Sequence, residues 1–269
     1  MKRPRITTRV AVAGLDEHRF RGHAVFSELV SRLSFTGLVS LAITGRVPDD
    51  ETVAVLDEIA CTLTLADPRF WHLKVSRMAA SFGSSMLGTC LGPLALEGAL
   101  IGSSVPPLAA KWLVRYVEGR KGGGSIESMV EEIMDGKSHL PGFGLPGRKV
   151  DERTECLKGR LRSLGRDRLP YWKSFWEVAD SLAGSPRMTP NHAGAAAAAF
   201  LDSGYSPDEI RHLAPILPLP TFLANAVEGA EQRSSILRRL PLECITFEGS
   251  PARRSPRALA DGDDAPESR

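Results

Sequence analysis

Apolar side chains recur at spacings of three and four residues along most of this sequence, which is the pattern of a helix face. Between residues 25 and 33 the apolar positions are Val25, Phe26, Leu29, Val30 and Leu33. No segment alternates apolar and polar residues over more than a few positions, so strands are not expected in the body of the chain. The sequence therefore predicts an all-α fold.

Helix start and stop signals divide the chain further. Gly45, followed by Pro48, predicts the end of a helix over residues 35–43. Asp49 to Glu51 place negative charge at the start of the next helix, which we expect to reach residue 65. Ser206 to Glu209 read Ser-Pro-Asp-Glu and predict a capping box. The other predicted helices are a small-residue hairpin over 75–102 and the segments 106–118, 126–134, 152–164, 171–182, 195–199 and 221–233.

Composition narrows the function classes. With 269 residues, 42% of them hydrophobic, the chain is typical of a globular protein. A net charge of +2 does not favour a nucleic-acid partner. The four cysteines are far apart, which favours reduced thiols packed in the core over a disulfide framework or a metal site. There is no apolar run of about 18 residues, so we expect no membrane span and a cytoplasmic location. Residues 249–269 are polar, and we expect this tail to be disordered.

The stretch GKSHLPGFGLPGRKVDER, residues 136–153, carries the clearest ligand-like pattern. Gly142 and Gly144 flank Phe143, and basic residues and an Asp-x-Arg follow. In one interpretation, the glycines let backbone N–H groups approach a ligand. In the other, this is a tight turn that the fold itself requires. The sequence leaves both open.

Five segments, in this order, resemble the citrate synthase superfamily, and most closely its short citryl-CoA lyase form. They are SFTGLVSLAITGRVPDDE (34–51), RMAASFGSS (77–85), the 136–153 stretch, PNHAGAAAAAFLDSGYSPDEI (190–210) and LAPILPLPTFLANAVEGAEQ (213–232). The resemblance covers residues 3–235. It implies a helical homodimer with a large domain (1–144 and 216–248), a small domain (145–215) and a cleft that closes on a CoA thioester. It also implies carbon–carbon bond formation or cleavage beside the thioester carbonyl, without a metal.

The chemistry of that family needs a carboxylate base, histidines at the thioester and ketone oxygens, and arginines for carboxylates. In this sequence, Leu145 replaces the family's histidine after Gly-Phe-Gly. Ala193 replaces the base aspartate, and Pro218 replaces one of the arginines. The family's first histidine aligns loosely with residues 103–105 or 96–99, which contain none. These replacements remove the inherited mechanism, so we predict neither citrate synthase nor citryl-CoA lyase activity.

The remaining polar residues at these positions form the candidate catalytic set. His192 is next to the replaced aspartate, although a neighbouring helix position points about 100° away. Asn191 caps the helix, Asn225 replaces a histidine, and Ser104 supplies a hydroxyl. His139 is a further histidine near the loop, with a surface or hinge role as its alternative.

The resemblance also implies that the loop contacts the cofactor, and the cations that follow could bind its phosphates. The alternative is a solvated basic run paired with Asp151 and Glu152. The predicted cofactor-binding residues are Gly142, Phe143, Gly144, Leu145, Arg148, Lys149 and Arg153.

Two functions follow. The first is an enzyme that uses acyl-CoA with a small, more apolar acyl acceptor or product in place of a dicarboxylate. The second is a non-catalytic homodimer or subunit that binds acyl-CoA or supports an active relative. The retained loop favours the first and the missing catalytic residues favour the second. We lean towards the enzyme.

Overall fold

The computed structural model describes residues 5–14, 16–64, 67, 69–97, 102–136, 139–145, 150–185, 187–232 and 241–249. Residues Met1–Ser234 form one compact unit and Ser235–Arg269 a second. In the second unit, the described residues contain one short 3-10 helix, η2 (Leu242–Cys244). Two predicted cofactor contacts, Arg148 and Lys149, lie outside the described residues, as do residues 250–269 of the predicted tail. The division into large and small domains stays a prediction.

A small antiparallel sheet near the N-terminus was not predicted. Its strands are β1 (Ala11–Ala13), β2 (His18–Phe20) and β3 (His23–Ala24), in the order β1-β2-β3. Val12 faces Arg19, and Phe20 faces His23. Strands of two or three residues are too short to produce a recognisable alternation.

The helix predicted over 25–33 is wrong in its extent. A single π-helical turn, η1 (Val25–Leu29), ends where Val30 turns to extended backbone. Glu28 holds the start of this turn, since its carboxylate accepts a hydrogen bond from Ala24 N (3.1 Å) and contacts His23 Nδ1 (2.7 Å).

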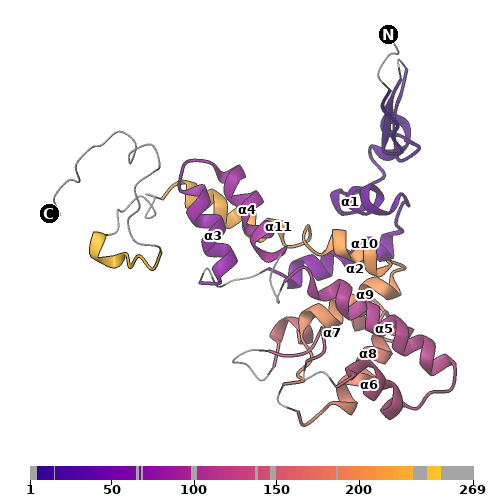
Figure 1. The fold of residues 1–269 in the computed structure, drawn as a ribbon. Coiled ribbons are helices and arrows are strands. Elements are labelled where there is room, and N and C mark those ends of the chain that lie inside the picture. Colours follow the sequence, from indigo (N-terminus) through magenta and orange to yellow (C-terminus); the bar gives the residue numbers. More distant parts are fainter. Residues whose placement is uncertain are drawn as a thin grey trace, which may run out of the picture. The chain divides into compact units, whose positions relative to one another are not determined.

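The remaining elements of the described first unit are helices, which confirms the all-α prediction apart from the small sheet. The main group surrounds α9, whose run from Ala195 to Ala199 is buried and lets neighbouring helices approach (Figure 1). The helices of this group are α1 (Phe35–Thr44), α2 (Asp50–Thr62), α5 (Val105–Lys121), α6 (Ile126–Met134), α7 (Glu152–Ser163), α8 (Pro170–Ser181), α9 (His192–Asp202) and α10 (Pro207–Leu213).

Side-chain caps start three of these helices. Ser34, Asp49 and Ser125 each accept a hydrogen bond from a backbone N–H in the first turn of their helices. Gly45 ends α1 with φ of 73°, a left-handed conformation that glycine adopts without strain. At α10, Ser206 and Glu209 form the predicted capping box.

Three further helices form a separate group: α3 (Trp71–Ala80), α4 (Ser85–Glu97) and α11 (Leu219–Ala230). Among the described elements they contact one another and none of the other helices. Their small core contains Leu73, Leu96 and Phe222. Ser76 joins all three helices, because its hydroxyl lies 2.9 Å from Gly88 O and 3.2 Å from Phe222 O.

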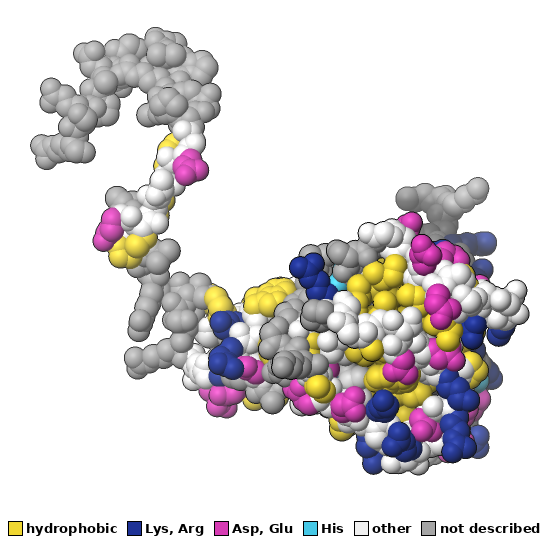
Figure 2. All heavy atoms as spheres, turned by 90° about the horizontal axis from the view of Figure 1, so that it is seen from below, with side chains coloured by type: hydrophobic (Ala, Val, Ile, Leu, Met, Phe, Trp, Pro, Cys, Tyr) yellow, Lys and Arg dark blue, Asp and Glu magenta, His cyan; other side chains and the backbone are white. Residues whose placement is uncertain are grey.

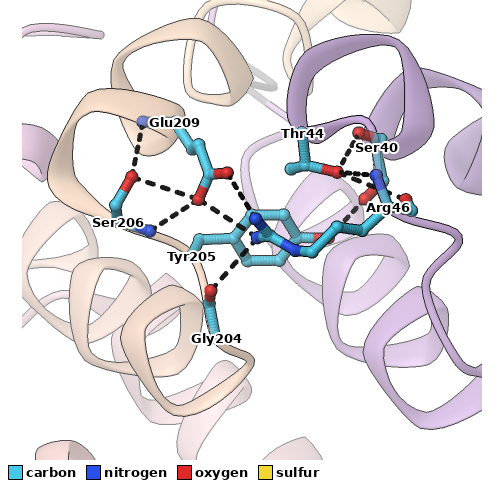
Figure 3. Close-up of polar contacts among 7 residues, drawn as sticks. All are labelled: Ser40, Thr44, Arg46, Gly204, Tyr205, Ser206 and Glu209. Carbon is cyan, nitrogen blue, oxygen red and sulfur yellow. Dashed lines mark hydrogen bonds and ion pairs between the residues drawn. The ribbon is translucent and has the colours of Figure 1, made fainter. Parts of the chain in front are cut away.

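A polar joint connects the end of α1 to the start of α10 (Figure 3). Arg46 Nη1 donates to Glu209 Oε1 at 2.8 Å, and Arg46 Nη2 donates to Gly204 O at 3.3 Å. Beneath this ion pair, the buried hydroxyls of Ser40 and Tyr205 are 2.7 Å apart. The joint therefore combines an exposed ion pair with a buried hydrogen bond.

The surface corrects one prediction. The four cysteines, Cys61, Cys90, Cys156 and Cys244, are free, but each is exposed and not packed in the core. On the face shown in Figure 2, basic and acidic side chains are mixed around hydrophobic ones. No helix in the described residues is long and apolar enough to cross a lipid bilayer.

Candidate functional site

The Gly142–Gly144 loop is joined by its backbone to the segment that leads into α9. Asn191 N donates to Gly142 O at 3.0 Å, and Gly144 N donates to Thr189 O at 2.8 Å. Phe143 forms an isolated antiparallel bridge with Pro190. Phe143 N is also used, since it donates to Leu140 O at 3.0 Å. The amides of Phe143 and Gly144 therefore serve the fold, which favours the interpretation of this loop as a structural turn.

The glycines of this loop are required by backbone conformation and by close packing. Gly142 and Gly144 both have φ of 92°, in the left-handed region. A Cβ at Gly142 would lie 2.8 Å from Gly194 Cα, so the loop touches the first turn of α9 directly. Phe143 is 1% exposed, and its ring centroid lies 5.4 Å from that of Phe175. Phe143 is thus a core residue in this structure.

Asn191, a candidate catalytic residue, is the N-cap of α9. Its Oδ1 accepts a hydrogen bond from Gly194 N at 3.2 Å, and its Nδ2 donates to Gly144 O at 3.0 Å. The amide group thereby links the glycine loop to the helix. These two hydrogen bonds hold the glycine loop and the start of α9 in one arrangement.

Asp151 connects two helix starts. It is the N-cap of α7, where it accepts a hydrogen bond from Arg153 N at 3.1 Å, and it also accepts one from His192 N at 3.0 Å. Arg153 Nε and Nη2 donate to its two carboxylate oxygens at 2.8 and 2.7 Å. Burial acts to raise the pKa of Asp151, but the hydrogen bonds and charge of Arg153 and the backbone donors outweigh it and lower the pKa. Asp151 is therefore a buried carboxylate whose charge is compensated.

His192, the first residue of α9, is 1% exposed, and its side chain contacts the end of α2. Its Nε2 is 2.8 Å from Thr62 Oγ1, while its buried Nδ1 has no hydrogen-bond partner in the described structure. Burial, and then the charge of Arg153, lower the pKa of His192 to about 3. The imidazole is therefore neutral near pH 7 and has no contact with solvent. Sequence reasoning missed Thr62, because 130 residues separate it from His192.

The other two candidate catalytic residues lie elsewhere. Asn225 is on α11, where its Oδ1 accepts from Arg77 Nη1 at 3.2 Å and its Nδ2 donates to Thr221 O at 2.9 Å. Arg77 Nη1 also donates to Glu228 Oε2 at 2.7 Å. Ser104 is the half-buried N-cap of α5, and its side chain makes no cap hydrogen bond. No contact between the described elements joins α11 to α7 or α9, so the predicted catalytic set is not one cluster in this chain.

Two side chains beside the loop are open to solvent. Arg153 is 32% exposed, although its Nε and Nη2 are engaged by Asp151. His139 is exposed, and a Cβ at Gly144 would lie 3.4 Å from His139 Nε2. Leu145, which follows the glycines, is half-buried. Among its described residues, the site therefore presents one imidazole and one guanidinium around a neutral backbone turn. In the described residues, no three His, Cys, Asp or Glu side chains gather as metal ligands.

This architecture is the citrate synthase superfamily fold in its citryl-CoA lyase-like form. The structure is similar to that of citryl-CoA lyase from Hydrogenobacter thermophilus, with a TM-score of 0.77 and 24% identity over 95% of this chain and 99% of that one. It is also similar to ATP citrate lyase from Methanothrix soehngenii in complex with citrate and coenzyme A. That TM-score is 0.72 and the identity is 17%, over 96% of this chain and 44% of the other.

Citrate synthase from Thermoplasma acidophilum, in a ternary complex with carboxymethyl coenzyme A and oxaloacetate, has a TM-score of 0.60. It is 18% identical over 84% of this chain and 60% of the other. No protein-family model matches the sequence, and no curated protein matches it. The comparisons thus establish the fold.

Proposed function

We propose that this protein binds a CoA thioester and acts at the carbon next to the acyl carbonyl, with a partner more apolar than a dicarboxylate. The support is the fold, which is similar to that of ATP citrate lyase and citrate synthase in complexes with CoA or a CoA derivative. The site supports the change of partner, because Leu145, Ala193 and Pro218 provide neither protons nor positive charge. Arg153 is the half-exposed cation that could bind a CoA phosphate or a carboxylate of the ligand.

The fold carries the proposal, and the glycine loop, Asn191 and Asp151 supply a rigid surface at the proposed site. Hydrogen bonds join these groups to the first turns of α7 and α9. A turn fixed in this way is preorganised, so binding a ligand against it costs little ordering of the backbone. His139 and Arg153 stand beside the turn and supply its exposed polar groups.

A second candidate function is a non-catalytic protein that binds acyl-CoA. The specific observation in its favour is that His192 and Asn191 have structural partners. His192 is buried against Thr62, and both polar atoms of the Asn191 side chain are used within the fold. Neither is available for proton transfer in this arrangement, so we propose structural roles for both.

We also propose that the protein is a homodimer that pairs through α3, α4 and α11. These helices and the turn between α3 and α4 expose many large apolar side chains, more than an isolated soluble surface usually shows in one place. A second copy would cover this surface with one of identical chemistry, as an isologous interface requires. The exposed residues are Trp71, Met78, Phe82, Met86, Leu87, Leu91, Leu94, Leu223 and Val227.

Thermal unfolding with and without acetyl-CoA tests the proposed function. At about 100 times its dissociation constant, a ligand of the native state raises the free energy of unfolding by about 2.7 kcal/mol. We expect stabilisation by acetyl-CoA or free CoA, and no citrate when oxaloacetate is added to acetyl-CoA. Absence of a shift with a series of CoA thioesters would reject CoA binding. Rapid citrate formation would reject the proposed apolar partner.

A further inference from the structure

His139 occupies an anchored position at the edge of the glycine loop. The next residue, Leu140, is 2% exposed, and Trp112 Nε1 donates a hydrogen bond to Pro141 O at 2.9 Å. These contacts fix the backbone directly after His139. Its imidazole then lies over the α-carbon of Gly144, since a Cβ there would be 3.4 Å from Nε2 and 3.6 Å from Cδ2. A substituent at Gly144 would therefore meet the ring.

The other histidines are unsuited to proton transfer at this loop. His192 and His72 are buried, and burial lowers the pKa of each. His18 and His23 belong to the N-terminal sheet, where His18 contacts Phe26 and His23 contacts Glu28. His212 is on α10. Of the six histidines in the chain, His139 is thus the exposed one that borders the glycine loop.

A continuous set of contacts connects His139 to Arg153, another exposed group among the described residues of the site. His139 packs on Gly144, Gly144 O accepts from Asn191 Nδ2, and the backbone N of the residue after Asn191 donates to Asp151. Asp151 in turn holds Arg153. The residues in the middle of this set have structural roles, whereas the two at its ends, His139 and Arg153, are exposed to solvent. Within the described residues, His139 makes no hydrogen bond, so no described group occupies its imidazole nitrogens.

We infer that His139, and not His192, is the residue that transfers a proton at the substrate, an inference that rests on the proposed CoA-thioester function. A neutral imidazole nitrogen takes a proton from the carbon next to the thioester carbonyl. The C–H bond breaks, an N–H bond forms, and the electron pair becomes the enolate of the thioester. Return of the proton to the same carbon restores the thioester, so no co-reactant is needed for this half of the reaction.

Exchange of the acetyl-CoA methyl protons in D2O measures that step without knowledge of the second substrate. We expect the wild-type protein to incorporate deuterium, detected by mass spectrometry. We expect His139→Gln to lower the rate by about 100-fold or more while acetyl-CoA binding is kept. The matched control is His212→Gln, an exposed histidine on α10, which should exchange like the wild type.

Carbethoxylation with diethyl pyrocarbonate gives a second measurement that needs no activity. His139 should be modified in the free protein and protected by saturating acetyl-CoA, while His212 is modified equally in both. Exchange unchanged in His139→Gln, absence of exchange in a wild type that binds acetyl-CoA, or equal labelling of His139 with and without bound acetyl-CoA would each overturn the inference. If thermal unfolding shows no binding of any CoA thioester, the proposed function fails, and the inference fails with it.

Discussion

Asp151 is the residue on which the local geometry of the site depends. Its single carboxylate caps α7, accepts the first N–H of α9 and is paired with Arg153. A buried carboxylate with this many donors is stabilised in its charged form. From the sequence we predicted the helix that begins at residue 152, but not this cap. The bond to His192 N could not be predicted, because it depends on how two distant segments meet.

Close contact between Gly142 and Gly194 leads to a prediction at the residue scale. A Cβ at Gly194 would lie 2.5 Å from Phe175 Cε2 and 2.6 Å from Gly142 O. Because Gly142 O is a backbone atom, it cannot move aside as easily as the end of a side chain. We expect Gly194→Ala to lower the free energy of unfolding by about 1–3 kcal/mol in urea denaturation. Gly159→Ala is the control, because a Cβ at this α7 position meets no atom within 4 Å. Alanine there should stabilise by up to about 1 kcal/mol. Equal effects of the two substitutions would contradict this close packing.

Burial of neutral His192 predicts a pH dependence of stability. The pKa of His192 is about 3 in the native state, against an ordinary value of 6.5. Between pH 3 and pH 6.5, the unfolded chain therefore binds a proton at this residue that the native protein does not bind. Acidification from pH 6.5 towards 3 therefore favours unfolding, by about 1.4 kcal/mol per pH unit from this residue.

The measurement is urea denaturation of the wild type and of His192→Gln at several pH values. The difference between their free energies of unfolding should change across this range, with the wild type losing more on acidification. Parallel curves would show that His192 titrates normally and is accessible to protons.

At the scale of elements, the signals that predicted the fold correctly were local. Gly45 ends α1, Asp49 precedes the start of α2, and Ser206 and Glu209 form the capping box of α10, as the sequence predicts. The alanine run predicted a tightly packed helix, and α9 is the helix against which α5 and α8 pack. The errors lay in residues 11–33, where short strands and a π-turn depend on pairing that no periodic pattern reveals.

The polar joint between α1 and α10 predicts a modest loss of stability on mutation. Glu209→Ala removes the capping box of α10 and the partner of Arg46 together. We expect a decrease of about 1 kcal/mol in the free energy of unfolding, mostly from the cap, because Arg46 is 58% exposed and solvent screens the pair. Asp208→Asn, one residue earlier, should cost about 0.3 kcal/mol. If Glu209→Ala lowered the free energy of unfolding no more than Asp208→Asn does, the polar joint would make no contribution to stability.

At the scale of the whole molecule, the resemblance of five segments, in the right order, predicted the citrate synthase superfamily fold, and the structure confirms that fold. The composition of the site was harder to predict. Asn191, Asp151 and the glycine loop lie together in the structure, but Asn225 is on a helix that does not contact α7 or α9 within one chain. Sequence order places a residue on an element, whereas its burial and partners depend on the packing of all the elements.

Assembly through α3, α4 and α11 makes a prediction at this same scale. Leu94 on α4 is 65% exposed, and Leu94→Glu would bury a charge at the proposed interface. Light scattering after size exclusion should show a dimer for the wild type and a monomer, or a dimer weakened by at least about tenfold, for this variant. Phe35→Glu is the control, because Phe35 is 78% exposed at the start of α1, outside the three-helix group. A wild-type monomer, or equal dissociation of both variants, would contradict the proposed interface.

Hydrogen–deuterium exchange of the full chain with and without saturating acetyl-CoA tests most directly whether the glycine loop belongs to a CoA-thioester site. We predict slower amide exchange on binding in peptides that contain residues 139–145, 150–153 and 187–194, and the same protection in His192→Gln. Protection confined to other segments while acetyl-CoA is bound would contradict this claim, because the glycine loop would then be a structural turn without a ligand.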